Sequence, residues 1–306
     1  MDYPRIIKPS ANLSCFIAMF LWALGFVAAE NLFNSWGALA MLSARLVISA
    51  SFLLVWWRIK EGKSAIFSAP WKKGIVIGSV GWGIGGILLL IGQKLSDPVT
   101  TTIAVAMMPL SAVAIEVFFG DRNLTLRLVC GITLALLGGY LATGARFSDS
   151  GFGLGVILCL GAITLFAWAT RATTRNLKTL SSTGQTTVTL TGAMLITVLV
   201  HAAALVTGFG ETTIGQFGIE NLWILLIFML LSCGIAQLFW IWGADRLGVL
   251  LASFHMNIVP FYVMAMLVLV VSAEWQWIQA LGAAIVALAV LISQMGAAPL
   301  LRTRDR

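Results

Sequence analysis

The sequence predicts an all-α polytopic membrane protein whose ten transmembrane helices form two inverted five-helix repeats. Three observations predict this fold class: the composition, a regular succession of apolar runs and an internal duplication. Hydrophobic residues make up 59% of the chain and charged residues only 10%, with a mean hydropathy of +0.97. Because about a quarter of the residues in a soluble domain are charged, this composition indicates a protein that has the lipid bilayer as its solvent.

Ten apolar runs are each long enough to cross the bilayer, which takes about 20 helical residues. Charged or Gly/Pro-containing connectors separate the runs. The first run ends in small residues, as a signal peptide does, but the duplication requires it as a helix. We expect spans 1 to 10 near residues 11–32, 36–57, 71–93, 98–119, 125–143, 151–171, 183–207, 221–243, 249–271 and 275–294.

The positive charges predict the orientation of the chain. All Lys and Arg residues except Arg45, Lys94 and Arg146 lie at the two termini or in connectors that follow even-numbered spans. Connectors rich in Lys and Arg remain in the cytoplasm, so the sequence predicts a multi-pass protein of a bacterial inner membrane with both termini cytoplasmic. The cations are spread over short connectors, which argues against the clustered basic face of a nucleic-acid partner.

An internal duplication is visible when the chain is shifted by 151 positions. The shift pairs Gly83 with Gly234, Gly92 with Gly243, Pro109 with Pro260, and Gly131 with Gly282. A slightly different shift aligns Trp22 with Trp168. The predicted units are a first repeat over 1–147, a second over 148–297 and a basic cytoplasmic tail over 298–306. Because five spans are an odd number, the second repeat is inverted, as in alternating-access carriers.

Two prolines lie at matching depth in the duplicated halves. Pro109 is near the middle of span 4 and Pro260 near the middle of span 9. A proline inside a helix removes a hydrogen bond and kinks the chain. We interpret the pair as hinge or gating elements, with a simple packing kink as the alternative.

The chain lacks the motifs of an enzyme and of a cofactor site. Its four cysteines lie in apolar runs without the spacing of a zinc site or a disulfide framework. A phosphate-binding lysine loop, a metalloprotease motif and a serine-hydrolase motif are all missing from the sequence. We therefore expect no enzymatic activity, no catalytic residue, no metal and no cofactor.

A few polar and aromatic residues at mid-membrane are candidates for a substrate site. Arg45 in span 2 is interpreted as a structural charge that caps carbonyls or pairs with an acid, with binding of a substrate carboxylate as the alternative. His255 and Gln237 lie at similar depth in adjacent spans and could meet. An apolar pocket with a few polar groups suits a small zwitterion. The predicted substrate-binding residues are Trp22, Trp82, Met107, Trp168, Gln237, Trp240, His255 and Asn257.

Several short patterns together resemble a known superfamily. They are Trp22-x-x-Gly25-Phe26, Ala44-Arg45, Gly92 followed by Pro109, Gly131 to Gly139, and the second-half residues Gly243, Pro260 and Gly282. The chain resembles the drug/metabolite transporter (DMT) superfamily, in particular ten-helix carriers with two EamA-type repeats. Within it, the chain is most similar to YddG-type exporters of aromatic amino acids.

The resemblance implies export of amino acids, aromatic or large neutral ones among them, from the cytoplasm through a central cavity. As a separate expectation, the protein works as a monomer. The alternatives are export of other metabolites or drugs on the same fold, and a non-transporting membrane scaffold. If a proton is coupled to transport, His255 is the titratable side chain placed for it. Uncoupled movement down the substrate gradient is equally compatible with the sequence.

Overall fold

The computed structural model describes residues 9–120, 125–142, 150–208, 210–216 and 218–294. Within these ranges all regular elements are helical. Eight helical stretches are long and apolar enough to cross a membrane, and two shorter apolar helices, Leu126–Ala142 and Trp277–Ile292, accompany them. The predicted fold class is therefore confirmed. The predicted basic tail, 298–306, lies outside the described residues.

Six spans each consist of one helix, and four are divided into several helical segments. Spans 1, 2, 5, 6, 7 and 10 are α1 (Pro9–Leu32), α2 (Ala38–Phe67), α7 (Leu126–Ala142), α8 (Ser150–Asn176), α9 (Ser182–Thr207) and α14 (Trp277–Gln294), of which α2 is broken by a kink at Gly62. Span 3 consists of α3 (Trp71–Ile77), η1 (Gly78–Ile84) and α4 (Gly85–Leu95), and span 4 of α5 (Pro98–Ala106) and α6 (Met108–Phe118). Span 8 follows η3 (Ile219–Asn221) and consists of α10 (Leu222–Leu226), η4 (Ile227–Ile235) and α11 (Ala236–Leu247). Span 9 consists of α12 (Val249–Ser253), η5 (Phe254–Ile258) and α13 (Val259–Val271).

The interruptions recur at the spacing of the sequence duplication. The π-helical segments η1 and η4 end at Ile84 and Ile235, which are 151 positions apart. The helices that follow the breaks in spans 4 and 9 begin at Met108 and Val259, again 151 positions apart. Pro109 and Pro260 each lie in the first turn of such a new helix. The missing proline N–H costs nothing at that position, because the first turn has no intrahelical acceptor for it.

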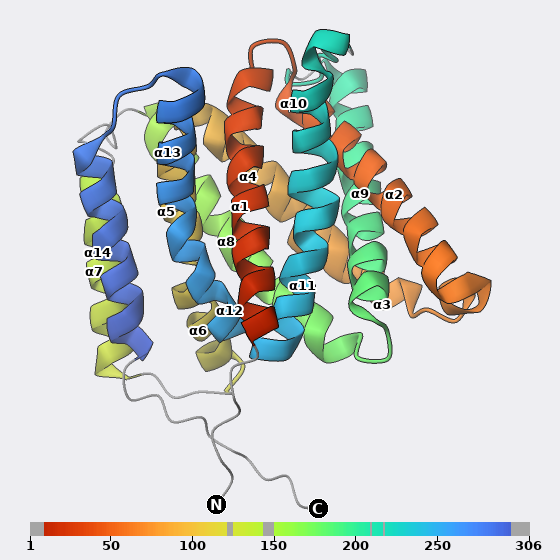
Figure 1. Ribbon diagram of the computed structural model, residues 1–306, viewed down its shortest axis with the longest axis horizontal. Coiled ribbons are helices and arrows are strands. Elements are labelled where there is room, and N and C mark those ends of the chain that lie inside the picture. The colour runs from red at the N-terminus through yellow and green to blue at the C-terminus, as the bar shows by residue number, and fades with distance from the viewer. Residues whose placement is uncertain (1–8, 121–124, 143–149, 209, 217, 295–306) are drawn as a thin grey trace, which may run out of the picture.

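Helix packing follows the same two-fold scheme (Figure 1). Span 3 packs on span 6 through α4 and α8, and its counterpart span 8 packs on span 1 through α11 and α1. Spans 2 and 7, 4 and 9, and 5 and 10 each pack on their own counterpart, as α7 and α14 do at one side of the molecule in Figure 1. The two halves therefore interlock around a shared centre.

Glycines allow the paired spans to approach closely. A Cβ on Gly92 would meet the Cys159 sulfur at 2.6 Å across spans 3 and 6, and a Cβ on its repeat partner Gly243 would meet the Cys15 sulfur across spans 8 and 1. Small residues are the usual means of close helix packing in membranes, where no hydrophobic force draws helices together. The sequence match of Gly92 with Gly243 thus reflects two equivalent contacts.

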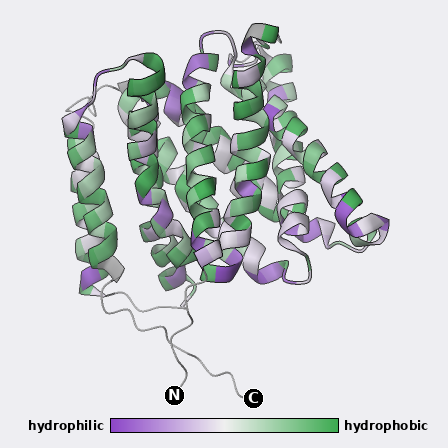
Figure 2. Ribbon diagram, viewed as in Figure 1, coloured by the Kyte–Doolittle hydropathy of each residue, from purple (hydrophilic) through white to green (hydrophobic). Residues whose placement is uncertain are grey.

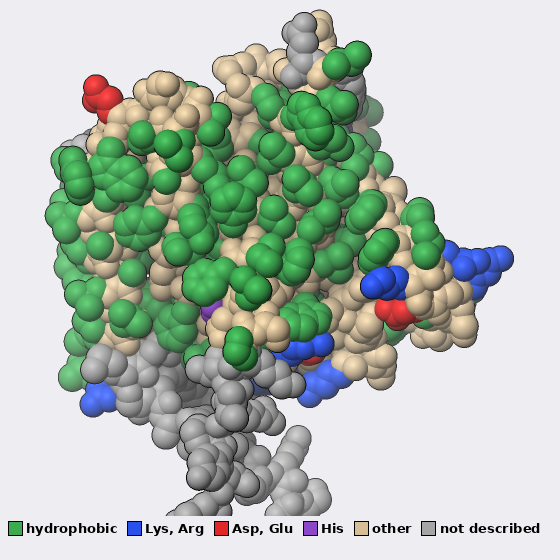
Figure 3. Space-filling view, viewed as in Figure 1, with side chains coloured by type: hydrophobic (Ala, Val, Ile, Leu, Met, Phe, Trp, Pro, Cys, Tyr) green, Lys and Arg blue, Asp and Glu red, His purple; other side chains and the backbone are tan. Residues whose placement is uncertain are grey.

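The polar and apolar parts of the surface are separated along the helices. Hydrophobic residues cover the middle of the bundle in Figure 2, and Lys and Arg side chains lie along the lower edge of the face in Figure 3. We call this edge, where α1 begins and α2 ends, the basic end. Helix α2 extends beyond the predicted limit of span 2 at residue 57, and it continues to Phe67 with a kink at Gly62. Lys, Arg and Glu favour helix, so the charges of this segment end the apolar run and not the helix.

Candidate functional site

A central cavity of about 100 Å³ lies between the two halves. A cavity of this volume has room for on the order of seven water molecules or a small organic molecule. Spans 1 to 4 of the first half and spans 6 to 9 of the second half all contribute to its lining. An inverted-repeat carrier holds its substrate at such an interface between repeats.

Aromatic rings form much of the cavity wall. Trp82 stacks on Phe166 across spans 3 and 6, with ring centroids 5.1 Å apart. Trp22 lies 5.6 Å from the ring of Trp240. Trp240 is fully buried behind Trp22 and donates its indole N–H to Thr170 Oγ1 at 3.2 Å. The lining aromatic residues are Trp22, Phe26, Trp82, Phe166 and Phe228.

Arg45 is the charged residue of the cavity lining. Its Nη2 donates to the Ser232 carbonyl oxygen at 2.7 Å and lies 3.2 Å from Ser232 Oγ. The guanidinium lies 4.5 Å from the centroid of the Phe228 ring. Among the described residues no acidic side chain pairs with it. The cation therefore reaches the cavity with most of its N–H donors unused.

The contact of span 2 with span 8 explains why an arginine is tolerated there. The π-helical segment η4 has an irregular backbone, which needs hydrogen-bond partners from its surroundings at membrane depth. Besides the Arg45 bond to Ser232, Ser49 Oγ donates to the Met229 carbonyl and accepts a bond of 3.1 Å from the Gly234 N–H. Span 2 thus stabilises the irregular part of span 8.

Two further polar groups of the lining have no hydrogen-bond partner among the described residues. They are Nε2 of Gln237 and Nε1 of Trp82, and both atoms are buried. The Gln237 side chain is only 4% exposed and the Trp82 side chain 6%. A buried donor without a partner costs free energy, so both groups suit a ligand with acceptor atoms.

The other predicted site residues lie outside the cavity lining. His255 and Asn257 line a separate, open groove with Phe16, and the His255 ring meets the edge of the Phe16 ring at 4.7 Å. The structure therefore does not bring His255 together with Gln237. Met107 is buried at the break of span 4, and its neighbour Met108, not Met107, lines the cavity. Trp168 is half-buried and packs against the core.

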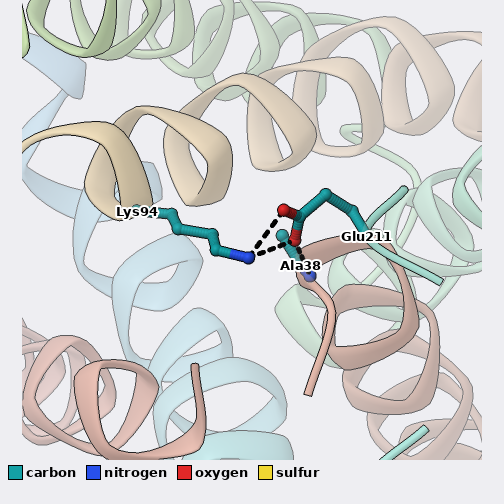
Figure 4. A network of polar contacts seen from close by, with 3 residues as sticks. All are labelled: Ala38, Lys94 and Glu211. Atoms are coloured by element: carbon teal, nitrogen blue, oxygen red, sulfur yellow. Dashed lines mark hydrogen bonds and ion pairs between the residues drawn. The ribbon is translucent and has the colours of Figure 1, made fainter. Parts of the chain in front are cut away.

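The end of the molecule opposite the basic end is held by Glu211, in the connector between α9 and η3 (Figure 4). Its Oε2 accepts the Ala38 N–H at 2.8 Å, and its backbone oxygen accepts the N–H groups of Leu39 at 3.0 Å and Ala40 at 3.3 Å. Lys94 at the end of α4 lies 2.6 Å from Oε1. Glu211 therefore caps the first turn of α2, which has no side-chain cap of its own, and connects the second half to spans 2 and 3.

These contacts predict a pH-dependent stability. Burial raises the pKa of Glu211, but the Ala38 N–H and the Lys94 bond and charge outweigh it and hold the pKa below the usual 4.5. A lowered pKa stabilises the folded state above the unfolded-state value, and the stabilisation is lost as the pH falls through the folded-state value. We expect Glu211→Gln to lower the melting temperature in detergent at pH 7. When the pH falls below about 5, the melting temperature of Glu211→Gln should decrease less than that of the wild type.

Glu274→Gln is the matched control, because Glu274 is an exposed acid at the same end. It should leave both the melting temperature and its pH dependence unchanged. Equal acid sensitivity of the wild type and Glu211→Gln would show that the Glu211 contacts do not stabilise the fold.

The fold and the cavity together define a polytopic helical membrane protein with a central site shared by two interlocked halves. The sequence profile of the EamA-like transporter family matches residues 9–144, so the first half of the chain is similar to that family.

The solved structures support the fold alone. A protein whose structure is described only as "Crystal structure of protein" shares 19% sequence identity with this chain. It has a TM-score of 0.70, and the alignment covers 94% of this chain and 97% of that chain. None of the curated proteins matches the chain.

Proposed function

We propose that the protein exports amino acids with aromatic or other large neutral side chains from the cytoplasm of a bacterium by alternating access through the central cavity. The observation that carries the proposal is a cavity that combines aromatic walls from both halves with Arg45 and Gln237. Such a pocket can enclose an apolar side chain and hydrogen-bond the polar end of the molecule. The basic end would face the cytoplasm, because Lys/Arg-rich connectors remain there.

The recurring breaks in spans 3, 4, 8 and 9 support the alternating-access part of this proposal. They give each half the same pair of irregular spans, so the two halves can exchange conformations in a related way. Pro109 and Pro260, at the start of matching helices, are the proposed hinges.

The test is uptake of labelled tryptophan, phenylalanine and threonine into proteoliposomes, with and without a pH gradient. We expect saturable flux that Gln237→Ala reduces at least about tenfold, because a hydrogen bond to a charged group contributes about 1.5–3 kcal/mol. His255→Ala is the comparison variant, because His255 lies in a separate groove, and it should retain flux. Flux of none of these amino acids would contradict the proposed substrate class and favour other metabolites on the same fold.

A further inference from the structure

The hydrogen-bonding groups that the cavity leaves unused are mainly donors. Nε1 of Trp82 and Nε2 of Gln237 are buried and have no partner among the described residues. Arg45 adds the N–H groups of Nε and Nη1, because within the described part of the chain only its Nη2 has a hydrogen-bond partner. An indole N–H and a guanidinium can donate but cannot accept. The ligand that satisfies such a set is an acceptor, and the Arg45 charge favours an anionic one.

The lining offers no negatively charged side chain to pair with a cation. None of the lining residues is an aspartate or a glutamate. The acid Glu30 contacts a lining residue, because its Oε2 lies 3.4 Å from Nε2 of Gln93. The same Gln93 nitrogen donates to the Phe26 carbonyl oxygen at 2.9 Å. Glu30 itself is exposed outside the cavity, so an ammonium group inside it would find no carboxylate to pair with.

We propose that the cavity selects its substrate by a carboxylate next to an aromatic or apolar group and does not require an amino group. The carboxylate would be held by Arg45, Trp82 and Gln237, and the apolar part by the rings of Trp22, Phe166 and Phe228. This inference relies on the proposed function for the location of the substrate site. It adds the chemical class of substrate that the site binds. Aromatic carboxylates without an amino group should then bind to the cavity as aromatic amino acids do.

The charge of the cavity lining favours the binding of a carboxylate over the binding of a cation, because the lining contains Arg45 and no acidic residue. A charged side chain at membrane depth is costly unless it is compensated. The Ser232 carbonyl oxygen and the Phe228 ring contact Arg45 but carry no net charge. A bound carboxylate would supply the missing negative charge, whereas an amine would add a second positive charge to a cavity of about 100 Å³.

The experiment compares three probes that share one phenyl ring. Binding of 3-phenylpropionate, phenylalanine and 2-phenylethylamine is measured by calorimetry on the full chain in nanodiscs of neutral lipid. We expect 3-phenylpropionate to bind at least as tightly as phenylalanine, and 2-phenylethylamine at least tenfold more weakly than either. Amine binding within twofold of the acid, or binding of neither, would overturn the proposal.

Variants test the donor set without removing the cavity walls. Trp82→Phe keeps an aromatic ring and removes the N–H, and Gln237→Leu replaces the amide by an apolar group of similar size. Each should weaken the binding of 3-phenylpropionate several-fold. Trp57→Phe is the matched control, because Trp57 is fully buried with an equally unpartnered Nε1 but lies outside the lining; it should have no effect. An equal loss in Trp57→Phe and Trp82→Phe would contradict the assigned donors.

A further variant addresses the amino group. Glu30→Gln should leave the order of the three probes unchanged, and a selective loss of phenylalanine binding would show that Glu30 serves the ammonium and overturn the proposal. Because binding needs no gradient, binding of 3-phenylpropionate by a protein that moves no amino acid would contradict the proposed function and leave this inference intact. Amino-acid flux together with tight binding of the amine would contradict the inference alone.

Discussion

Replacement of Arg45 by alanine is expected to reduce the flux of labelled phenylalanine at least about 100-fold in proteoliposomes. A hydrogen bond to a charged group contributes about 1.5–3 kcal/mol, and 1.4 kcal/mol corresponds to a factor of ten, so the loss of two such bonds to a carboxylate accounts for this factor. The measurement is the initial rate at several substrate concentrations. A rise in the apparent KM would locate the loss in substrate binding.

The same variant also removes the bond from Arg45 to the Ser232 carbonyl oxygen, so a structural effect must be separated from a loss of binding. Arg45→Lys retains the charge but not the planar fork of donors, and we expect it to recover part of the flux. Arg58→Ala is the control, because Arg58 is an exposed cation in the same helix α2. Normal flux in Arg45→Ala would show that the side chain only supports the π-helical segment η4.

The fold could be predicted from the sequence because bilayer thickness and charge distribution constrain it strongly. Apolar runs fix the number of spans, and the pairing of Pro109 with Pro260 indicates the duplication. The π-helical segments were not predicted. Their residues, such as those of Gly78–Ile84, are as apolar as the regular helices around them, so hydropathy carries no signal for the irregular backbone.

The candidate site was only partly predictable, because sequence gives the depth of a residue but not the face of the helix on which it lies. Trp22, Trp82 and Gln237 do line the cavity. His255 was expected at a similar depth to Gln237, but it lies next to Phe16 in a separate groove. A π-helical turn or a 3₁₀ turn rotates all later residues about the helix axis, so regular helical spacing fails beyond it.

Other residues of the site and its surroundings were missed for the same kinds of reason. Phe166 lines the cavity two positions before the predicted Trp168, and the shared Phe-x-Trp pattern of spans 1 and 6 was the available signal. Glu211 and Lys94 are 117 residues apart, and neither lies in a motif. Long-range contacts of this kind depend on the path of a connector, which a single sequence does not specify.

The second large effect is expected at Gly25, where span 1 meets span 8 beside the cavity. A Cβ at this position would overlap with Ser232 Oγ and Cβ and would lie 3.8 Å from Nη2 of Arg45. Ser232 cannot turn away freely, because its Oγ donates to the Phe228 carbonyl oxygen at 3.0 Å. Gly25→Ala should therefore separate the two spans and displace Arg45. Overpacking of this kind lowers the free energy of unfolding by about 1–3 kcal/mol. We therefore expect Gly25→Ala to have a lower melting temperature and a reduced flux.

A double variant tests this steric explanation directly. Ser232→Gly removes both atoms that the new methyl group would meet, so Gly25→Ala combined with Ser232→Gly should be more stable than the sum of the two single effects predicts. Gly161→Ala is the matched control in α8, because its Cβ would meet only Leu88 Cδ1 at 3.6 Å, an ordinary contact. Additive effects of the two variants would contradict direct contact between Gly25 and Ser232. If stability is recovered but flux is not, the remaining loss belongs to Ser232 Oγ, which lies 3.2 Å from Nη2 of Arg45, because the variant keeps the backbone carbonyl oxygen at this position. The packing of spans 1 and 8 and the position of the cation are then separate requirements of transport.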